Sequence, residues 1–193
     1  VRIYLDVETY RPRREDAFVN EKVIAIGLLE DYTPYTTNSL NMLVNKLLFT
    51  EWELSSEEKI VKNFYHYLRK ILTNEARFLV VVGFNILRMD IPLLIQKGVE
   101  YNVEGLSGLN QLWHNTFTID FFQLLLLANK FRFKGLKLAR VLQLIRDELG
   151  YKDAPLVEEH GEDVAEAYKE ERYGDIERWL EKDLYAIRYI DLS

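Results

Sequence analysis

The 193-residue sequence contains no cysteine, and this absence excludes disulfide frameworks, thiolate zinc sites and a cysteine nucleophile. Histidine is scarce as well, with one residue at each of positions 66, 114 and 160 and no His-x-x-x-His pair. We therefore expect no metal site built from imidazoles. Any metal in this protein would have to be held by carboxylates, which hard divalent cations prefer.

The sequence also lacks an apolar run long enough to span a membrane, and its N-terminus lacks a signal-peptide pattern. We expect a soluble, cytoplasmic protein without a membrane partner. Its formal net charge of -6 argues against a protein that coats nucleic acid through bulk positive charge. An enzyme that holds one nucleic-acid end in a metal-loaded acidic cleft remains compatible with this charge, because bound cations reverse the local sign.

The composition is that of a globular protein, with 48% hydrophobic and 29% charged residues. Residues 1–193 suffice for one domain with a real core, and we see no linker, repeat or low-complexity segment. Residue types and spacing predict strands at 1–5, 22–29, 32–37, 78–82 and 117–119. They predict helices at 55–73, 90–97, 121–129, 134–150 and 175–190. Loops are expected at 10–21 and 100–112, and a solvated helix face or loop at the acidic residues 157–172.

This order of elements predicts a mixed α/β sheet with helices on its faces. Residues 1 to about 50 would form an antiparallel meander. The continuous apolar strand at 78–82 would be a buried parallel strand, reached by a helical crossover. Ligands of such sheets bind near strand ends, and the first predicted strand runs directly into a pair of acids.

Asp6 and Glu8 are this pair. On a strand, residues i and i+2 point to the same face, roughly 7 Å apart. Two like charges at that spacing are unfavourable unless a cation joins them, and a divalent metal is the usual solution. The alternative is a strand that simply runs out into solvent, and the pair taken alone favours that alternative.

A second motif follows the buried strand, which ends at Gly83. Phe84 and Asn85 come next, and Asp90 stands five residues after Asn85 at the start of a helix. The alternative interpretations are an ordinary helix N-cap for Asp90 and a turn residue for Asn85. Asp120 also follows a strand, and for this residue we prefer the N-cap interpretation.

Trp179 and Asp183 form a third motif on the last predicted helix. They are spaced i and i+4 and therefore share one helix face. Leu184 and Ile187 lie near this face, which places Asp183 at the edge of the core. An acid in that position needs a partner.

Together these motifs resemble those of the DEDD family of 3′→5′ exonucleases, and most closely the proofreading exonuclease domain of family B DNA polymerases. Asp6-Val7-Glu8 resembles the first motif of that family, and Gly83-Phe84-Asn85 with Asp90 resembles the second. Asp183 takes the place of the acid in the third motif. The resemblance covers nearly the whole chain and implies an RNase H-like fold. Polymerase motifs are missing from the sequence, so we expect a stand-alone domain or a fragment.

The resemblance implies a metal-dependent 3′→5′ exonuclease that removes nucleotides from single-stranded 3′ ends, with DNA as the expected substrate and RNA left open. Two divalent cations, Mg²⁺ or Mn²⁺, would be held by Asp6, Glu8, Asp90 and Asp183. The nucleic-acid end would be contacted by Thr9, Tyr10, Phe84 and Asn85, with Phe84 able to stack on a base. A basic stretch could take the phosphates of the strand, although a solvated face is the preferred interpretation of Lys130, Arg132, Lys134 and Lys137.

Trp179 is the main departure from the family pattern. It stands where these exonucleases have a tyrosine that orients the attacking water, and an indole N–H can only donate. A related subgroup uses a histidine five residues before the Asp, where this chain has Arg178. The water-orienting group is therefore missing under either scheme, and Trp179 is expected to slow catalysis. The alternative function is an attenuated or inactive relative that binds nucleic-acid ends or a replication or repair partner, and a structural domain with scattered acids is a third interpretation.

Overall fold

The computed structural model describes the chain except for residues 34–43, 74–77, 159 and 162. One sheet lies at its centre, with the strand order β3-β2-β1-β4-β5. The strands are β1 (Arg2–Tyr10), β2 (Lys22–Asp31), β3 (Val44–Thr50), β4 (Val80–Gly83) and β5 (Phe117–Asp120). The first three pair antiparallel, whereas β4 pairs parallel with both β1 and β5. The predicted mixed α/β sheet, a meander plus parallel strands, is therefore confirmed.

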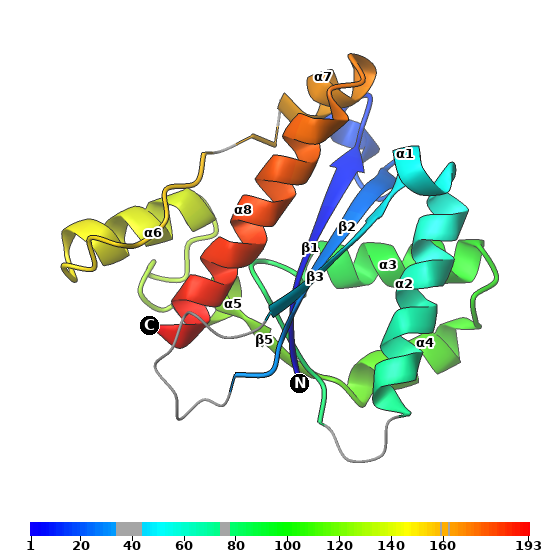
Figure 1. Ribbon diagram of the computed structural model, residues 1–193, viewed down its shortest axis with the longest axis horizontal. Helices are drawn as coiled ribbons and strands as arrows, with labels where there is room; N and C mark the ends of the chain where they lie inside the picture. Colours follow the sequence, from blue (N-terminus) through cyan, green and yellow to red (C-terminus); the bar gives the residue numbers. More distant parts are fainter. Residues whose placement is uncertain (34–43, 74–77, 159, 162) are drawn as a thin grey trace.

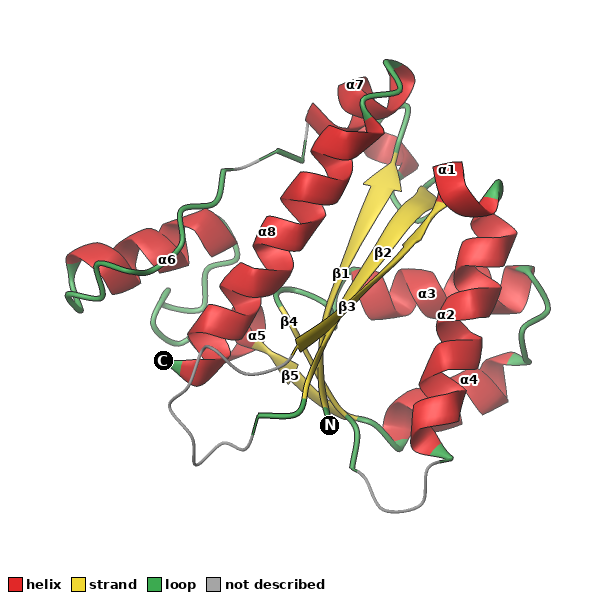
Figure 2. Cartoon of the chain, viewed as in Figure 1, coloured by secondary structure: helices red, strands yellow, loops and turns green. Residues whose placement is uncertain are grey.

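Helices cover both faces of this sheet (Figures 1 and 2). One face carries α8 (Tyr173–Leu192), and the other carries α2 (Glu57–Leu72), α3 (Asp90–Glu100) and α4 (Leu106–His114). The remaining helical elements are η1 (Arg14–Asp16), α1 (Glu51–Leu54), α5 (Phe121–Leu125), α6 (Leu138–Asp147) and α7 (Asp163–Lys169). The α2 helix starts two residues later than predicted, at Glu57, and the Ser56 side chain caps it by accepting a hydrogen bond from the Lys59 backbone N–H at 3.2 Å.

A glycine brings α8 close to the sheet. Gly27 lies on β2, and a Cβ at this position would lie 2.8 Å from Leu180 Cγ and 2.9 Å from Leu184 Cδ1. Both leucines are fully buried. Only a residue without a side chain allows α8 to pack this closely on β2. This close packing fixes the distance between the sheet and the α8 residues that lie between the two leucines.

Two predicted boundaries are wrong. Residues 100–112 were expected to be a loop, but α4 forms there because Leu109, Leu112 and Trp113 bury one face. The helix expected at 90–97 ends later than predicted, because α3 continues through Gly98 to Glu100. The reason is packing: a Cβ on Gly98 would lie 2.7 Å from Leu109 Cδ1.

The third strand of the meander also differs from the prediction. The strand expected at 32–37 has no strand structure at Tyr32 and Thr33, and positions 34–37 lie outside the described residues. β3 at Val44–Thr50 completes the meander instead. The helices expected at 121–129 and 134–150 are shorter than predicted, as α5 and α6. In the described parts of the chain, no helix has both the length and the apolar character to cross a membrane.

Candidate active site

Asp6 and Glu8 lie on β1, the middle strand of the sheet. Their register partners on β2 are Gly27 and Ala25. The parallel pairing of β1 with β4 ends at Tyr4, so β1 runs on beyond the end of its neighbour. This extension carries both acids to the edge of the sheet at which ligands of α/β proteins bind.

Asp90 at the start of α3 and Asp183 on α8 join these two acids. Burial raises the pKa of Asp6 well above its ordinary range, and the charges of Asp183, Glu8 and Asp90 raise it further. Burial also raises the pKa of Asp90 to about 8; a backbone hydrogen bond opposes this rise and the charge of Glu8 adds to it. The four acids thus share one electrostatic environment, in which ionising all of them is costly.

His160 lies in the same cluster. Its Nε2 is 3.5 Å from Glu8 Oε1 and 3.3 Å from Asp183 Oδ2, and its side chain is buried. Burial opposes a charge on the ring, but the hydrogen bonds and charges of Asp183 and Glu8 outweigh this effect and raise the pKa of His160 to about 10. Nδ1 is buried and has no hydrogen-bond partner among the described residues.

His160 was not placed among these acids from the sequence. His160 reaches the acids from the segment before α7, far from Asp183 in sequence, and no motif spacing reveals it. The one available signal was Asp183 itself, an acid at the core edge that needed a partner. His160 is this partner.

Trp179 holds the imidazole in place. The two rings stack with centroids 5.0 Å apart and an angle of 10° between their planes. Arg178, at the position where a related subgroup has histidine, instead forms a salt bridge with Asp175 at 2.7 Å. The side chain at the place of the motif tyrosine thus supports a histidine ring, and it is this ring that faces the acids.

Asp120 fixes the turn that follows β4. Its carboxylate accepts hydrogen bonds from the backbone N–H groups of Asn85 at 2.7 Å, Leu87 at 3.0 Å and Phe122 at 2.9 Å. The last of these caps α5, so the predicted N-cap is confirmed. The other two secure Asn85 in the left-handed region at φ 69°, which Asn tolerates better than most residues. Phe84 packs edge-on against Phe122, with centroids 5.8 Å apart.

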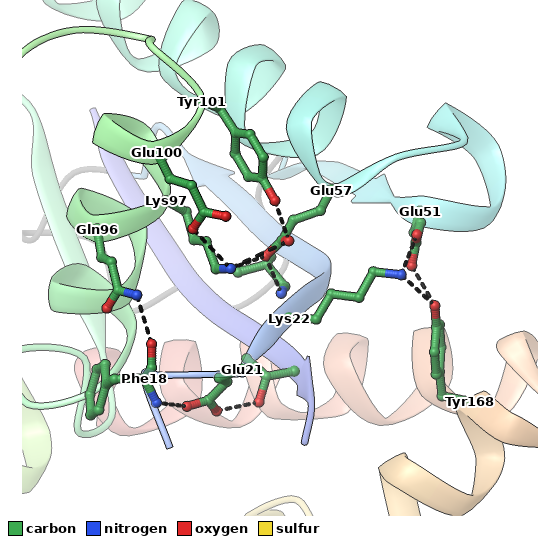
Figure 3. A network of polar contacts seen from close by, with 12 residues as sticks. Phe18, Glu21, Lys22, Glu51, Glu57, Gln96, Lys97, Glu100, Tyr101 and Tyr168 are labelled. Atoms are coloured by element: carbon green, nitrogen blue, oxygen red, sulfur yellow. Dashed lines mark hydrogen bonds and ion pairs between the residues drawn. The ribbon is translucent and has the colours of Figure 1, made fainter. Parts of the chain in front are cut away.

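Thr9 and Tyr10 are engaged with neighbours within the protein. The Thr9 hydroxyl donates to Glu21 at 2.7 Å, and the same carboxylate accepts from the Phe18 backbone N–H at 2.9 Å (Figure 3). Tyr10 packs against Tyr168 of α7, with centroids 5.0 Å apart. Glu21 was not singled out from the sequence. It is buried, and its charge is among the causes that raise the pKa of Asp90.

A second network in the same view ties α2 and α3 to the sheet (Figure 3). Glu57 accepts hydrogen bonds from the Val23 backbone N–H at 2.7 Å and the Tyr101 hydroxyl at 2.5 Å. Lys97 lies 3.3 Å from the same carboxylate. This network fixes α3, and therefore Asp90 at its start, relative to β2.

The residues present fit a divalent cation. One ligand atom from each of Glu8, His160 and Asp183 lies within 4.8 Å of the other two. Asp6 and Asp90 add a second observation: burial raises both pKa values and the charges of neighbouring carboxylates raise them further, and a bound cation would relieve this.

No protein-family model matches the chain, and no curated protein matches its sequence. Among solved structures, it is similar to the family B DNA polymerase from the hyperthermophilic archaeon Pyrobaculum calidifontis, with a TM-score of 0.63 and 14% identity over 96% of the chain. It is also similar to a zinc-bound form of the E. coli ExoI complex with single-stranded DNA, with a TM-score of 0.54 and 11% identity over 99% of the chain.

The chain spans 23% of the polymerase and 39% of the ExoI chain. At these identities, the likeness shows the fold. The chain accordingly has an α/β fold of the RNase H-like kind, shared with part of ExoI and with part of the polymerase.

Proposed function

We propose that this chain is a metal-dependent 3′→5′ exonuclease domain that acts on single-stranded ends, with DNA as the substrate. One observation carries the proposal: acids from β1, α3 and α8 meet around Asp6, with His160 in contact with two of them. The fold shared with ExoI and the polymerase supports it.

Asp6, Glu8, Asp90 and Asp183 would hold two divalent cations, Mg²⁺ or Mn²⁺. Bound there, the cations would supply Lewis-acid activation of water and charge stabilisation at the scissile phosphate. The protein itself contributes the fixed positions of these four acids. Asp6 and Glu8 are fixed by the sheet, Asp90 by the buried start of α3, and Asp183 by the seating of α8 on Gly27.

His160 would move the proton of the attacking water. Its pKa is raised because Glu8 and Asp183 stabilise the charged ring. Cations held by these two carboxylates would weaken this stabilisation, and Nε2 would then be able to accept a proton. Trp179 then acts as a positioning residue, since it keeps the imidazole plane in one orientation.

The terminal nucleotide would be contacted by the Phe84–Asn85 turn. Phe84 is half-buried and able to stack on a base. Asn85 offers a side-chain amide next to it, in a turn that Asp120 holds rigid. Thr9 and Tyr10 would make weaker contacts, because both already have partners within the protein.

A 5′-labelled single-stranded oligonucleotide tests the proposal. Incubation with Mg²⁺ or Mn²⁺ should give a ladder that shortens from the 3′ end, and Asp6→Asn should abolish it. Glu104→Gln changes an exposed acid between α3 and α4 that pairs with Arg69 of α2; it is the matched control and should leave the ladder unchanged. Absence of a ladder under either metal, or a ladder that persists in Asp6→Asn, would refute the function. An RNA oligonucleotide of the same sequence decides between the two substrates.

A second candidate is a domain that binds nucleic-acid ends, or a replication or repair partner, with little or no cleavage. The observation that favours it is the bridge from His160 to Glu8 and Asp183, which compensates both carboxylates without a metal. Trp179→Tyr separates the candidates. Under the exonuclease proposal we expect no large gain in rate, because His160 already serves the site. A large gain would mark the native site as attenuated.

A further inference from the structure

The basic–aromatic segment, residues 130–134 between α5 and α6, alternates cations with aromatic rings as Lys-Phe-Arg-Phe-Lys. All five side chains are exposed, and Phe131 and Phe133 are 71% and 54% accessible. Exposed apolar side chains that cluster on a protein surface mark interaction sites, whereas single ones are common.

The charge of the surrounding sequence indicates which class of partner this segment binds. From Phe121 to Arg146 the chain has six Lys or Arg residues and no Asp or Glu, within a protein of net charge -6. Among the described residues, Lys130, Arg132 and Lys134 form no salt bridge. A local concentration of cations on an acidic protein favours a polyanion. Aromatic rings interleaved with these cations match single-stranded nucleic acid, whose bases stack while its phosphates pair with the cations.

The segment has a defined shape. The Phe131 backbone N–H donates to the Leu126 carbonyl at 2.7 Å, and the Arg132 N–H donates to the Asn129 carbonyl at 3.0 Å. Lys130 and Phe131 both adopt left-handed backbone conformations, at φ 53° and 56°. Non-glycine residues take these conformations at a cost, and such strain concentrates at functional sites. The turn therefore presents Phe131 outward in a preorganised form.

A line of rings connects this segment to the candidate active site. Phe133 stacks on Phe122 with centroids 6.0 Å apart, and Phe122 meets Phe84 at 5.8 Å. The Arg88 guanidinium lies 4.2 Å from the centre of the Phe133 ring, and its Nη1 is 3.5 Å from Asn85 Oδ1. Arg88 is exposed and thus joins the Phe84–Asn85 turn to the basic–aromatic segment along the surface.

We propose that Arg88 and the basic–aromatic segment form an extended binding track for the single strand, which holds the nucleotides upstream of the 3′ end. The track rests on the proposed function only for its direction, from the Phe84–Asn85 turn outward. Its own contacts are base stacking on Phe131 and Phe133, and phosphate pairing with Lys130, Arg132 and Lys134.

Binding measured without cleavage tests the track independently of the reaction. Fluorescence anisotropy in EDTA is recorded with labelled single strands of about four and about twelve nucleotides. We expect Phe131→Ala to weaken binding of the longer strand about 5- to 10-fold and to leave the shorter strand unaffected. Phe78→Ala is the matched control, because Phe78 is 79% accessible and lies at the opposite end of β4.

Salt dependence tests the cations. The triple variant Lys130→Ala, Arg132→Ala, Lys134→Ala should reduce the slope of log K against log salt by about 2 for the longer strand. The triple variant Lys59→Ala, Lys62→Ala, Lys70→Ala removes the same charge from exposed positions on α2 and should leave the slope unchanged.

The combination of outcomes shows which proposal fails, the binding track or the exonuclease function. If the track variants keep the affinity for the longer strand and the salt slope of the unmodified chain, the track is overturned even if the ladder forms. The exposed segment would then be a surface for a protein partner. Length-dependent binding that Phe131→Ala weakens would sustain the track even if no ladder forms, in which case the exonuclease proposal fails alone. No binding of either strand by the unmodified chain would overturn the track.

Discussion

Among single side chains, His160 gives the most specific prediction for catalysis. Its Nε2 lies 3.3 Å from Asp183, and its ring is stacked on Trp179. We expect His160→Gln to lower kcat about 100-fold, because a positioned general base typically contributes that much or more, and to change KM little. His66→Gln, an exposed histidine on α2, is the control and should leave kcat unchanged. A kcat retained in His160→Gln would remove His160 from the chemistry.

The titration of two buried groups predicts how stability depends on pH in EDTA. The folded pKa of Asp90 is about 8, above the ordinary value of 3.8, so the folded state holds its proton longer than the unfolded state. Stability should therefore fall as pH rises from about 4 to about 8. The folded pKa of His160 is about 10, so its stabilising charge is fully present below about 6.5 and is lost towards 10.

Two variants distinguish the pH range in which Asp90 titrates from the range in which His160 titrates. Asp90→Asn should flatten the fall of the unfolding free energy between pH 4 and 8, and His160→Gln should flatten the fall between about 6.5 and 10. Urea unfolding across the pH range measures both effects. Variants with the slope of the unmodified chain would show that these groups are not buried together in the folded protein.

Among the elements, the contact of α8 with β2 controls where Asp183 lies. Gly27→Ala should force α8 away from the sheet, because the added methyl carbon meets Leu180 and Leu184 at less than 3.0 Å. We expect a loss of about 1–3 kcal/mol in the unfolding free energy, as for other overpacked cores, together with a loss of activity. Gly174→Ala in the same helix has no atom within 4 Å and should be neutral in both measurements. Equal effects of the two substitutions would contradict this account of the seating of α8.

The elements also show what a sequence can predict. The five-residue spacing from Asn85 to Asp90 and the i, i+4 spacing of Trp179 and Asp183 are local patterns, and they identified residues that the fold brings to one place. His160 has no such pattern, because its approach to Asp183 depends on the path of the chain between α6 and α8. The end of the helix predicted at residue 97 is wrong for a related reason: Gly98 lies within α3 and packs against Leu109, a contact that sequence spacing does not record.

At the scale of the whole molecule, two regions of opposite charge are separate. Acids gather at the edge of the sheet around Asp6, whereas the charged residues between Phe121 and Arg146 are all Lys or Arg. A single strand held along the cations would lead its end to the acids, where bound metal reverses the local sign. The order of the elements, and with it the fold, was predictable because strand and helix periodicities are local. The relation between the two charged regions was not, because the sheet order decides it.

The central claim is that Asp6, Glu8, Asp90 and Asp183 form a cradle for divalent cations. A crystal of the protein soaked in Mn²⁺, with anomalous scattering recorded, tests it most directly. We predict anomalous peaks within coordination distance, about 2.0–2.4 Å, of carboxylate oxygens of these residues, with the His160 ring displaced from Glu8 and Asp183 or coordinated beside them. Fully occupied Mn²⁺ elsewhere, with His160 still bridging Glu8 and Asp183 and no peak at Asp6, would contradict the claim.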